Sequence, residues 1–292
     1  MAPNEPLFLC YTHGLATKKR EGMCMYVTII NDCKDNNAMN RQATRAAAFF
    51  GAPVSKLGVT DFGEQGSGEI EAAGNIIETI DAAQDNPGII LANVAIRHGK
   101  GKRFPNGTPF GYFTYKDTFV FASIDGFTLS LVKKFGLTKT INVFDIPTVM
   151  DAMIAQGVFP KQQRELVVDS QFRSFEFLPR VAQWITKGLE VPSTPQSIDE
   201  VVDMPNCIWW VDNFGNCITS LLPADVDFAP GKKVSTKLGE FTCYQKLKDV
   251  PNGEEGLIIG SSGLGLQRFL WLVIQGGNFA KKHSVVTGTE IL

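Results

Sequence analysis

Residues 206–222 read NCIWWVDNFGNCITSLL, and this stretch carries an apolar run directly into a polar junction. The run is β-branched and aromatic and is bounded by turn residues, which predicts a buried strand. Asp212, Phe214 and Asn216 then supply a carboxylate, a flat apolar face and an amide, which a purine carrying a cationic group would need. The alternative interpretation is a tight β-turn, in which Asp and Asn cap the backbone and Gly215 adopts a positive φ.

The pattern of the chain changes near residue 190. Before it, helical periodicity over 36–50 and 69–84 alternates with apolar strand patterns, among them a continuous run at 89–96 suited to a central parallel strand. This alternation predicts an α/β layered domain with a largely parallel sheet. After it, short strands separated by Gly, Pro and Asn turns predict a small β-barrel.

We therefore expect an α/β N-terminal domain over 1–189, a linker over 190–200 and a β-barrel domain over 201–292. The 292 residues suffice for two such domains. The loops 18–22 and 100–107 remain unassigned, because either a lid or solvated surface would fit them.

Composition narrows the classes of partner. The formal charge is −2 and the predicted pI is about 6, which gives no electrostatic support for a nucleic-acid or anionic-membrane partner. No apolar run reaches the roughly 18–20 residues of a membrane span, and Met1–Pro6 is no signal peptide. Six scattered cysteines favour reduced thiols in the cytoplasm, and only three histidines argue against a zinc site.

Three segments of the C-terminal third resemble the S-adenosyl-L-methionine hydroxide adenosyltransferase family, which includes the fluorinases and chlorinases. They are VDNFGNCITSLLP (211–223), IIGSSG (258–263) with RFLWLVIQGGNFAKK (268–282), and VTGTEIL (286–292). The departure is a few extra residues near Leu264–Gln267. The resemblance implies an N-terminal α/β domain followed by a β-barrel. It also implies S-adenosylmethionine as substrate, no metal, and a homotrimer with sites between neighbouring subunits.

The resemblance also implies roles for individual residues of this region. Asp212 would hold the methionine ammonium group, Phe214 would stack on adenine, and Asn216 would read the adenine edge. A turn at Ser261 and Ser262 would bind the methionine carboxylate, for which an ordinary hairpin turn is the alternative. The backbone near Gly276 would complete the adenine pocket.

The N-terminal motifs depart from the family. Relatives end their first strand in a turn whose carboxylate holds the ribose hydroxyls, and here the matching segment YTHGL places His13 there. A neutral imidazole cannot accept from both hydroxyls as a carboxylate does. The literal TDFG at 60–63 falls on the next strand, and we interpret it as coincidence.

The water-activating site of the family is altered as well. In LANVAIRHGKGKR (91–103), Asn93 stands near the expected Asp, and Arg97, His98 or Arg103 are possible substitutes. An Asn is no charged acceptor, which reduces its ability to direct deprotonation of water. The alternative for this stretch is a solvated basic loop.

A further segment, QFRSFEFLPRVAQWI (171–185), resembles the Phe-x-x-x-acid segment of the family, with Phe172, Ser174 and Glu176 in register. Phe172 is a candidate ligand contact. The halide-using branch has Ser where Ser174 stands, and its hydroxyl and backbone N–H bind the nucleophile. The alternative is that Ser174 caps a helix N-terminus.

The sequence thus favours an S-adenosylmethionine-binding protein that attacks the ribose C5′ and gives adenosine and methionine, with Ser174 and Asn93 near the nucleophile. The alternative is a non-catalytic nucleoside sensor or trimeric scaffold that has lost the water-activating residues. A different α/β hydrolase finds no support, because GxSxG, GxGxxG and P-loop motifs are absent from the sequence.

Overall fold

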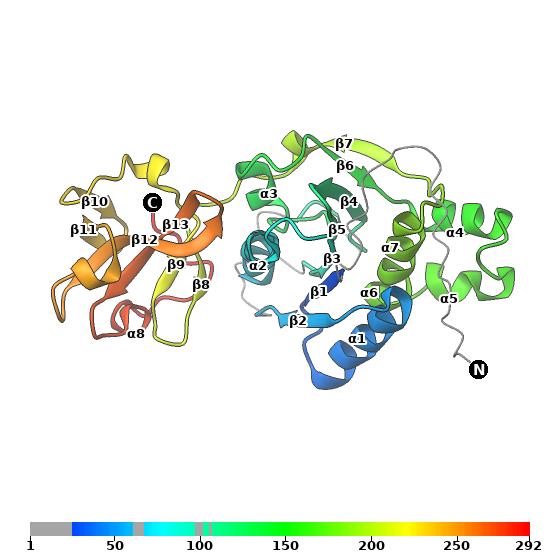
Figure 1. The fold of residues 1–292 in the computed structure, drawn as a ribbon, viewed down its shortest axis with the longest axis horizontal. Coiled ribbons are helices and arrows are strands. Elements are labelled where there is room, and N and C mark those ends of the chain that lie inside the picture. The colour runs from blue at the N-terminus through cyan, green and yellow to red at the C-terminus, as the bar shows by residue number, and fades with distance from the viewer. Residues whose placement is uncertain (1–24, 61–66, 97–101, 105–106) are drawn as a thin grey trace, which may run out of the picture.

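The computed structural model describes residues 25–60, 67–96, 102–104 and 107–292 (Figure 1). Within these ranges the chain forms two sheets, one in the N-terminal part and one in the C-terminal part. The predicted α/β class is confirmed. Over the same ranges, no helix combines the length and the apolar content that a bilayer crossing requires.

The N-terminal sheet has the strand order β2-β1-β3-β5-β4-β6-β7. The block β2-β1-β3-β5 is parallel, β4 runs antiparallel to both β5 and β6, and β7 runs antiparallel to β6. The continuous run at 89–96 is the central strand β3, as its two-sided burial requires. The strands are β1 (Tyr26–Asn31), β2 (Val54–Gly58), β3 (Gly88–Asn93), β4 (Phe110–Tyr115), β5 (Thr118–Ser123), β6 (Thr140–Val143) and β7 (Thr194–Ser197).

Helices cover both faces of this sheet, and each face has its own apolar core. One core gathers residues of α1, α4 and α7, and the other gathers residues of α2 and α3. The predicted helix over 36–50 is found with those bounds, because Asp35 accepts from the Ala38 N–H at its start and Gly51 ends it at φ 60°. The helices are α1 (Asn36–Phe50), α2 (Ser67–Ala83), α3 (Ser130–Lys134), α4 (Ile146–Ala155), α5 (Arg164–Val168), α6 (Arg173–Glu176), α7 (Leu178–Thr186) and α8 (Phe279–His283).

The C-terminal strands form one six-stranded sheet in the order β10-β11-β12-β13-β9-β8. Its core includes Phe241, Leu270, Leu272 and Phe279, all buried. The strands are β8 (Ile208–Val211), β9 (Cys217–Thr219), β10 (Lys233–Thr236), β11 (Gly239–Tyr244), β12 (Glu255–Leu264) and β13 (Gln267–Ile274).

Part of the predicted linker belongs to the N-terminal sheet. Residues 194–197 form β7, which pairs with β6 from Thr140↔Ser197 to Val143↔Thr194. In Figure 1 this strand runs along the outer edge of the N-terminal part before the chain enters the C-terminal part. The boundaries proposed for the two domains remain predictions.

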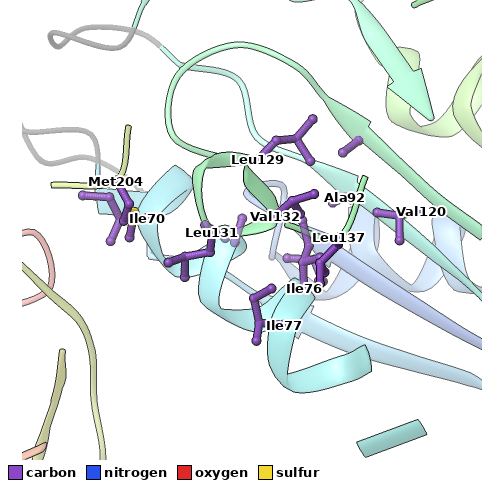
Figure 2. Packing of buried hydrophobic residues seen from close by; sticks show 14 of the residues in the cluster. Ile70, Ile76, Ile77, Ala92, Val120, Leu129, Leu131, Val132, Leu137 and Met204 are labelled. Atoms are coloured by element: carbon purple, nitrogen blue, oxygen red, sulfur yellow. The ribbon is translucent and has the colours of Figure 1, made fainter. Parts of the chain in front are cut away.

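Helix α2 is enclosed from two sides. Ile70, Ile76 and Ile77 belong to the core beneath the N-terminal sheet, where Figure 2 shows them near side chains of α3. A second stripe faces the C-terminal sheet. Gly74 lies against the Trp209 ring with no room for a Cβ, and the Glu78 carboxylate accepts from the Gly263 N–H at 2.8 Å. The sequence predicts the apolar stripe that faces the N-terminal core. The stripe at Gly74 and Glu78 was not predicted, because it depends on contact with the C-terminal sheet.

Candidate functional site

The β8–β9 connection is a tight turn organised by the Asp212 carboxylate. Oδ1 accepts from the backbone N–H groups of Phe214 and Asn216, both at 2.9 Å, and Oδ2 accepts from the Asn216 side-chain amide at 2.8 Å. Gly215 has φ 85°, as the turn interpretation expects. An ionised carboxylate offers about four acceptor positions, so Oδ2 keeps one for an outside donor. A turn and a ligand contact are therefore compatible here.

This turn lies beside the turn that joins β13 to α8. The Ala280 N–H donates to the Gly215 carbonyl at 3.0 Å, and Gly215 lies against Asn278. Gly276 occupies the second turn at φ 74° and is exposed. Phe214 is 69% exposed, which is unusual for a large apolar ring. The structure thus brings Asp212, Asn216 and Gly276 into neighbouring turns beside a free aromatic face.

The expectation of a turn at Ser261 and Ser262 is wrong, because both residues lie within β12. The pairing of β12 with β13 shifts register between Ile259 and Gly263, so the segment is a bulge. The Ser262 hydroxyl accepts from the Trp271 ring N–H at 2.8 Å, while Ser261 is exposed.

Ser261 also lies some way from the Asp212 turn. Leu257 of β12 pairs with Leu272, which in turn pairs with Cys217 just after the turn. Ser261 lies four residues further along β12, or about 13 Å at the usual rise of a strand. The hairpin tip formed by the extra residues near Leu264–Gln267 contacts α2 instead, where the Gly265 N–H donates to Asp81 at 2.8 Å.

In the N-terminal sheet, polar side chains gather at the carboxyl ends of β1 and β3. The Asn93 amide donates to Asn31 at 3.1 Å and to Asp32 Oδ1 at 3.2 Å, and Asp32 Oδ2 accepts from the Ala95 N–H at 2.7 Å. In the sheet, β2 lies on one side of β1, and β3 lies on its other side, followed by β5. Such a switch of direction leaves a crevice where α/β sheets bind ligands.

Asp32 is a residue that the sequence reasoning missed. The expected first strand at 7–11 and His13 lie outside the described residues, and the earliest strand within them is β1, which Asp32 follows directly. The available signal was the apolar run at 26–30 with a carboxylate placed at its end.

Phe172 and Ser174 are positioned by the short helix α6. Phe172 is its N-cap residue, so the interpretation of Ser174 as the cap is wrong. Ser174 is buried and 6% exposed, and the Phe172 ring lies 5.7 Å from the Arg41 guanidinium of α1. Among the described residues, no hydrogen bond links Ser174 to Asn93. Arg97 and His98 lie outside these residues.

Arg103 is exposed but contacts the fold. Its guanidinium donates to the carbonyls of Ile124 and Glu200 at 2.6 and 2.8 Å and lies 3.9 Å from Asp125. The basic-loop interpretation of 98–103 stays a prediction.

The sequence analysis also missed two buried carboxyl groups, Asp125 just after β5 and Glu69 in α2. Asp125 is fully buried and accepts from the Arg103 and Gly126 N–H groups. Glu69 of α2 is 1% exposed and accepts from the Phe127 N–H at 2.8 Å. Burial, together with the nearby charge of Asp125, raises the pKa of Glu69 to about 8, although the Phe127 N–H acts in the opposite direction. Glu69 is therefore largely protonated at neutral pH.

Across the described ranges, no three His, Cys, Asp or Glu side chains are grouped as a metal ion would require. The polar groups at the sheet edge and at the Asp212 turn are amides, carboxylates and backbone N–H groups. These groups suit the hydroxyls, amines and ring nitrogens of a small organic ligand.

Residues 206–292 match the sequence model of the SAM hydroxide adenosyltransferase C-terminal domain. The resemblance drawn from the motifs is confirmed. No curated protein matches the chain.

Two solved structures share the fold over most of the chain. One is an uncharacterized conserved protein from Thermotoga maritima, with TM-score 0.61 and 17% identity, covering 92% of this chain and 100% of that one. The other is a conserved hypothetical protein from Thermus thermophilus, with TM-score 0.55 and 16% identity, covering 92% of this chain and 100% of that one.

Proposed function

We propose that the protein binds S-adenosylmethionine as substrate and transfers or releases its adenosyl group by attack at the ribose C5′, giving adenosine and methionine when water attacks. The match of residues 206–292 to a SAM hydroxide adenosyltransferase domain carries this proposal. The thioether of methionine leaves as a neutral group, so the protein mainly has to position the nucleophile in line with the breaking bond.

The C-terminal contacts follow from the geometry of the two neighbouring turns. The remaining acceptor position on Asp212 suits the methionine ammonium group, and the exposed Phe214 ring suits a stacked adenine. Asn216 and the backbone at Gly276 supply donors and acceptors for the adenine edge. Ser261 and Ser262 lie about 13 Å further along the sheet, so we do not assign them to the methionine carboxylate, which is on the same carbon as the ammonium group.

The N-terminal contacts come from the carboxyl edge of the sheet. The resemblance places a ribose-binding carboxylate at the end of the first strand, and Asp32 occupies the end of β1. We assign Asp32 this role, with Asn93 and Ser174 near the nucleophile. Phe172 supplies a nearby apolar surface. The resemblance to the family supports a homotrimer with sites shared between subunits.

We also place the protein in the cytoplasm. Burial raises the pKa of the Cys207 and Cys217 thiols to about 12, so both stay protonated and unreactive. A reducing compartment suits such thiols.

One observation favours a second function, a non-catalytic sensor of S-adenosylmethionine or adenosine, or a trimeric scaffold. Asn93 is neutral, and the oxygens of Asp32 already accept hydrogen bonds from Asn93 and Ala95. A water molecule beside Asn93 would therefore lack the charged acceptor that an Asp at this position would provide.

Incubation with S-adenosylmethionine, followed by chromatography of the products, separates the two functions. Adenosine and methionine in equal amounts are the expected result. No product together with a rise in melting temperature would establish the sensor function. No thermal shift with S-adenosylmethionine, adenosine or methionine would overturn both.

A further inference from the structure

Arginine side chains gather around α6 with too few acidic partners. Four arginines lie in α6 or against it, and two of them contact its one carboxylate, that of Glu176, which leaves a formal excess of three positive charges. We call this group the α6 arginine cluster; it consists of Arg41, Arg45, Arg173 and Arg180.

Glu176 is already used twice. Its Oε2 lies 2.8 Å from Arg45 Nη1 and 3.2 Å from Arg180 Nη2. Arg180 nevertheless keeps a buried Nη1 without a hydrogen-bond partner among the described residues. Burial, with the nearby charge of Arg45, lowers the pKa of Arg180. The carboxylate therefore does not neutralise the cluster.

Arg41 and Arg173 have no acidic partner within the described ranges, whereas every other described arginine has one. Arg41 is exposed and lies four residues before Arg45 on α1, an arrangement that like charges disfavour. The guanidinium groups of Arg41 and Arg45 lie over the Phe175 ring, at 4.5 and 3.5 Å from its centroid respectively. Arg173 is half-buried, lies 5.7 Å from the Phe110 ring and rests against Gly107.

The cluster adjoins the carboxyl edge of the sheet. Gln42, the neighbour of Arg41 in α1, accepts from the Asn31 amide at that edge. Phe110 begins β4 opposite Ser123, at the end of β5. Arg173 therefore contacts the first residue of β4, and β4 is two strands from β3 in the sheet.

We propose that the α6 arginine cluster binds an oxyanion group, a phosphate or carboxylate carried by a small molecule that enters the crevice between β1 and β3. The planar guanidinium fork matches such groups through paired hydrogen bonds, which a spherical halide cannot form. The excess charge concentrates anions at this edge even though the whole chain is slightly acidic. The cluster is defined without reference to S-adenosylmethionine, so it stands apart from the proposed reaction.

Calorimetric titration of the full chain with sodium phosphate, sodium acetate and sodium chloride at constant ionic strength tests the proposal. Phosphate or acetate should bind at least about tenfold more tightly than chloride. The stronger of the two identifies the group. Equal binding of all three salts would overturn the proposal.

Variants assign the binding to the cluster. Arg41→Gln and Arg173→Gln should each weaken oxyanion binding about tenfold. Arg164→Gln is the matched control, because this arginine of α5 already pairs with Asp151 and its loss changes the total charge equally. Arg41 is exposed, so its variant decides the question if the half-buried Arg173→Gln fails to fold. Unchanged binding in Arg41→Gln would overturn the assignment.

Titration of the same samples with S-adenosylmethionine distinguishes the two proposals. Oxyanion binding without any S-adenosylmethionine binding would leave the cluster in place and overturn the proposed function. Binding of S-adenosylmethionine without any oxyanion binding would support the proposed function and overturn the proposal for the α6 arginine cluster.

Discussion

The Asp212 turn and the carboxyl edge of β1 and β3 both centre on a carboxylate, but they recruit its partners differently. The partners of Asp212 come from the next four residues. Those of Asp32 come from Asn93 and Ala95, about sixty residues later, and meet it only because β1 and β3 pair in parallel. A site made within one short segment can be read as a motif, whereas a site made by strand pairing cannot.

The largest expected effect comes from removing the charge of the Asp212 side chain while keeping its size. In Asp212→Asn, the side-chain oxygen still accepts from the Phe214 and Asn216 N–H groups, so the turn should form. The rise in melting temperature with S-adenosylmethionine should disappear, because an amide does not attract an ammonium group. Glu240→Ala, which removes an exposed carboxylate of β11, is the control. A full shift in Asp212→Asn would exclude this residue from the ligand site.

The second test concerns the buried carboxyl group of Glu69 in α2. The folded-state pKa of Glu69 is about 8, above its ordinary value of 4.5, so the folded chain holds a proton that the unfolded chain releases. Stability should therefore fall as pH rises from about 5 to 8. Glu69→Gln cannot ionise and should gain up to about 3 kcal/mol relative to wild type over this window. Urea unfolding at pH 5 and pH 8 measures the difference, and a pH-independent difference would contradict it.

The third test removes the Asp32 carboxylate at the carboxyl ends of β1 and β3. Asp32→Ala leaves the Ala95 N–H without its protein acceptor and removes one of the two acceptors of the Asn93 amide, which should lower the free energy of unfolding by about 1 kcal/mol. Asp203→Ala, at an 87% exposed side chain paired with Lys133, should change it by less than about 0.5 kcal/mol. Denaturant unfolding of both variants gives the comparison. Equal losses would show that the edge contributes nothing to the fold.

The smallest expected effect concerns the junction of the two parts. Arg268 of β13 pairs with Asp81 of α2 at 2.8 Å, and both side chains are partly exposed. A double-mutant cycle with Arg268→Ala and Asp81→Ala should give a coupling of about 1 kcal/mol or less. A coupling of several kcal/mol would mean that this pair, rather than apolar packing, holds the parts together.

The sequence predicted the elements whose pattern is local. The helix over 36–50 and the central strand were found because caps and a continuous apolar run mark them. The run at 23–30 could not be typed, because β1 is buried on both faces and shows no alternation. Ser261 and Ser262 were placed in a turn because IIGSSG (258–263) resembles the carboxylate-binding turn of the family, although these residues lie at a register shift within β12.

The candidate site was predicted in the same uneven way. Asp212, Phe214 and Asn216 were found within one motif. Asp32 and Glu69 were missed, because the first depends on which strand comes first and the second on burial that no sequence pattern records.

The close approach of Gly74 to Trp209 limits how this protein can change. Helix α2 is packed on two sides within one apolar core that also includes Trp209, so a larger residue on either stripe disturbs a neighbour on that side. Substitutions along α2 should therefore be accepted less often than those along α1, whose outer face is open to solvent. In a library of random variants, α2 would stand out as the helix that tolerates least.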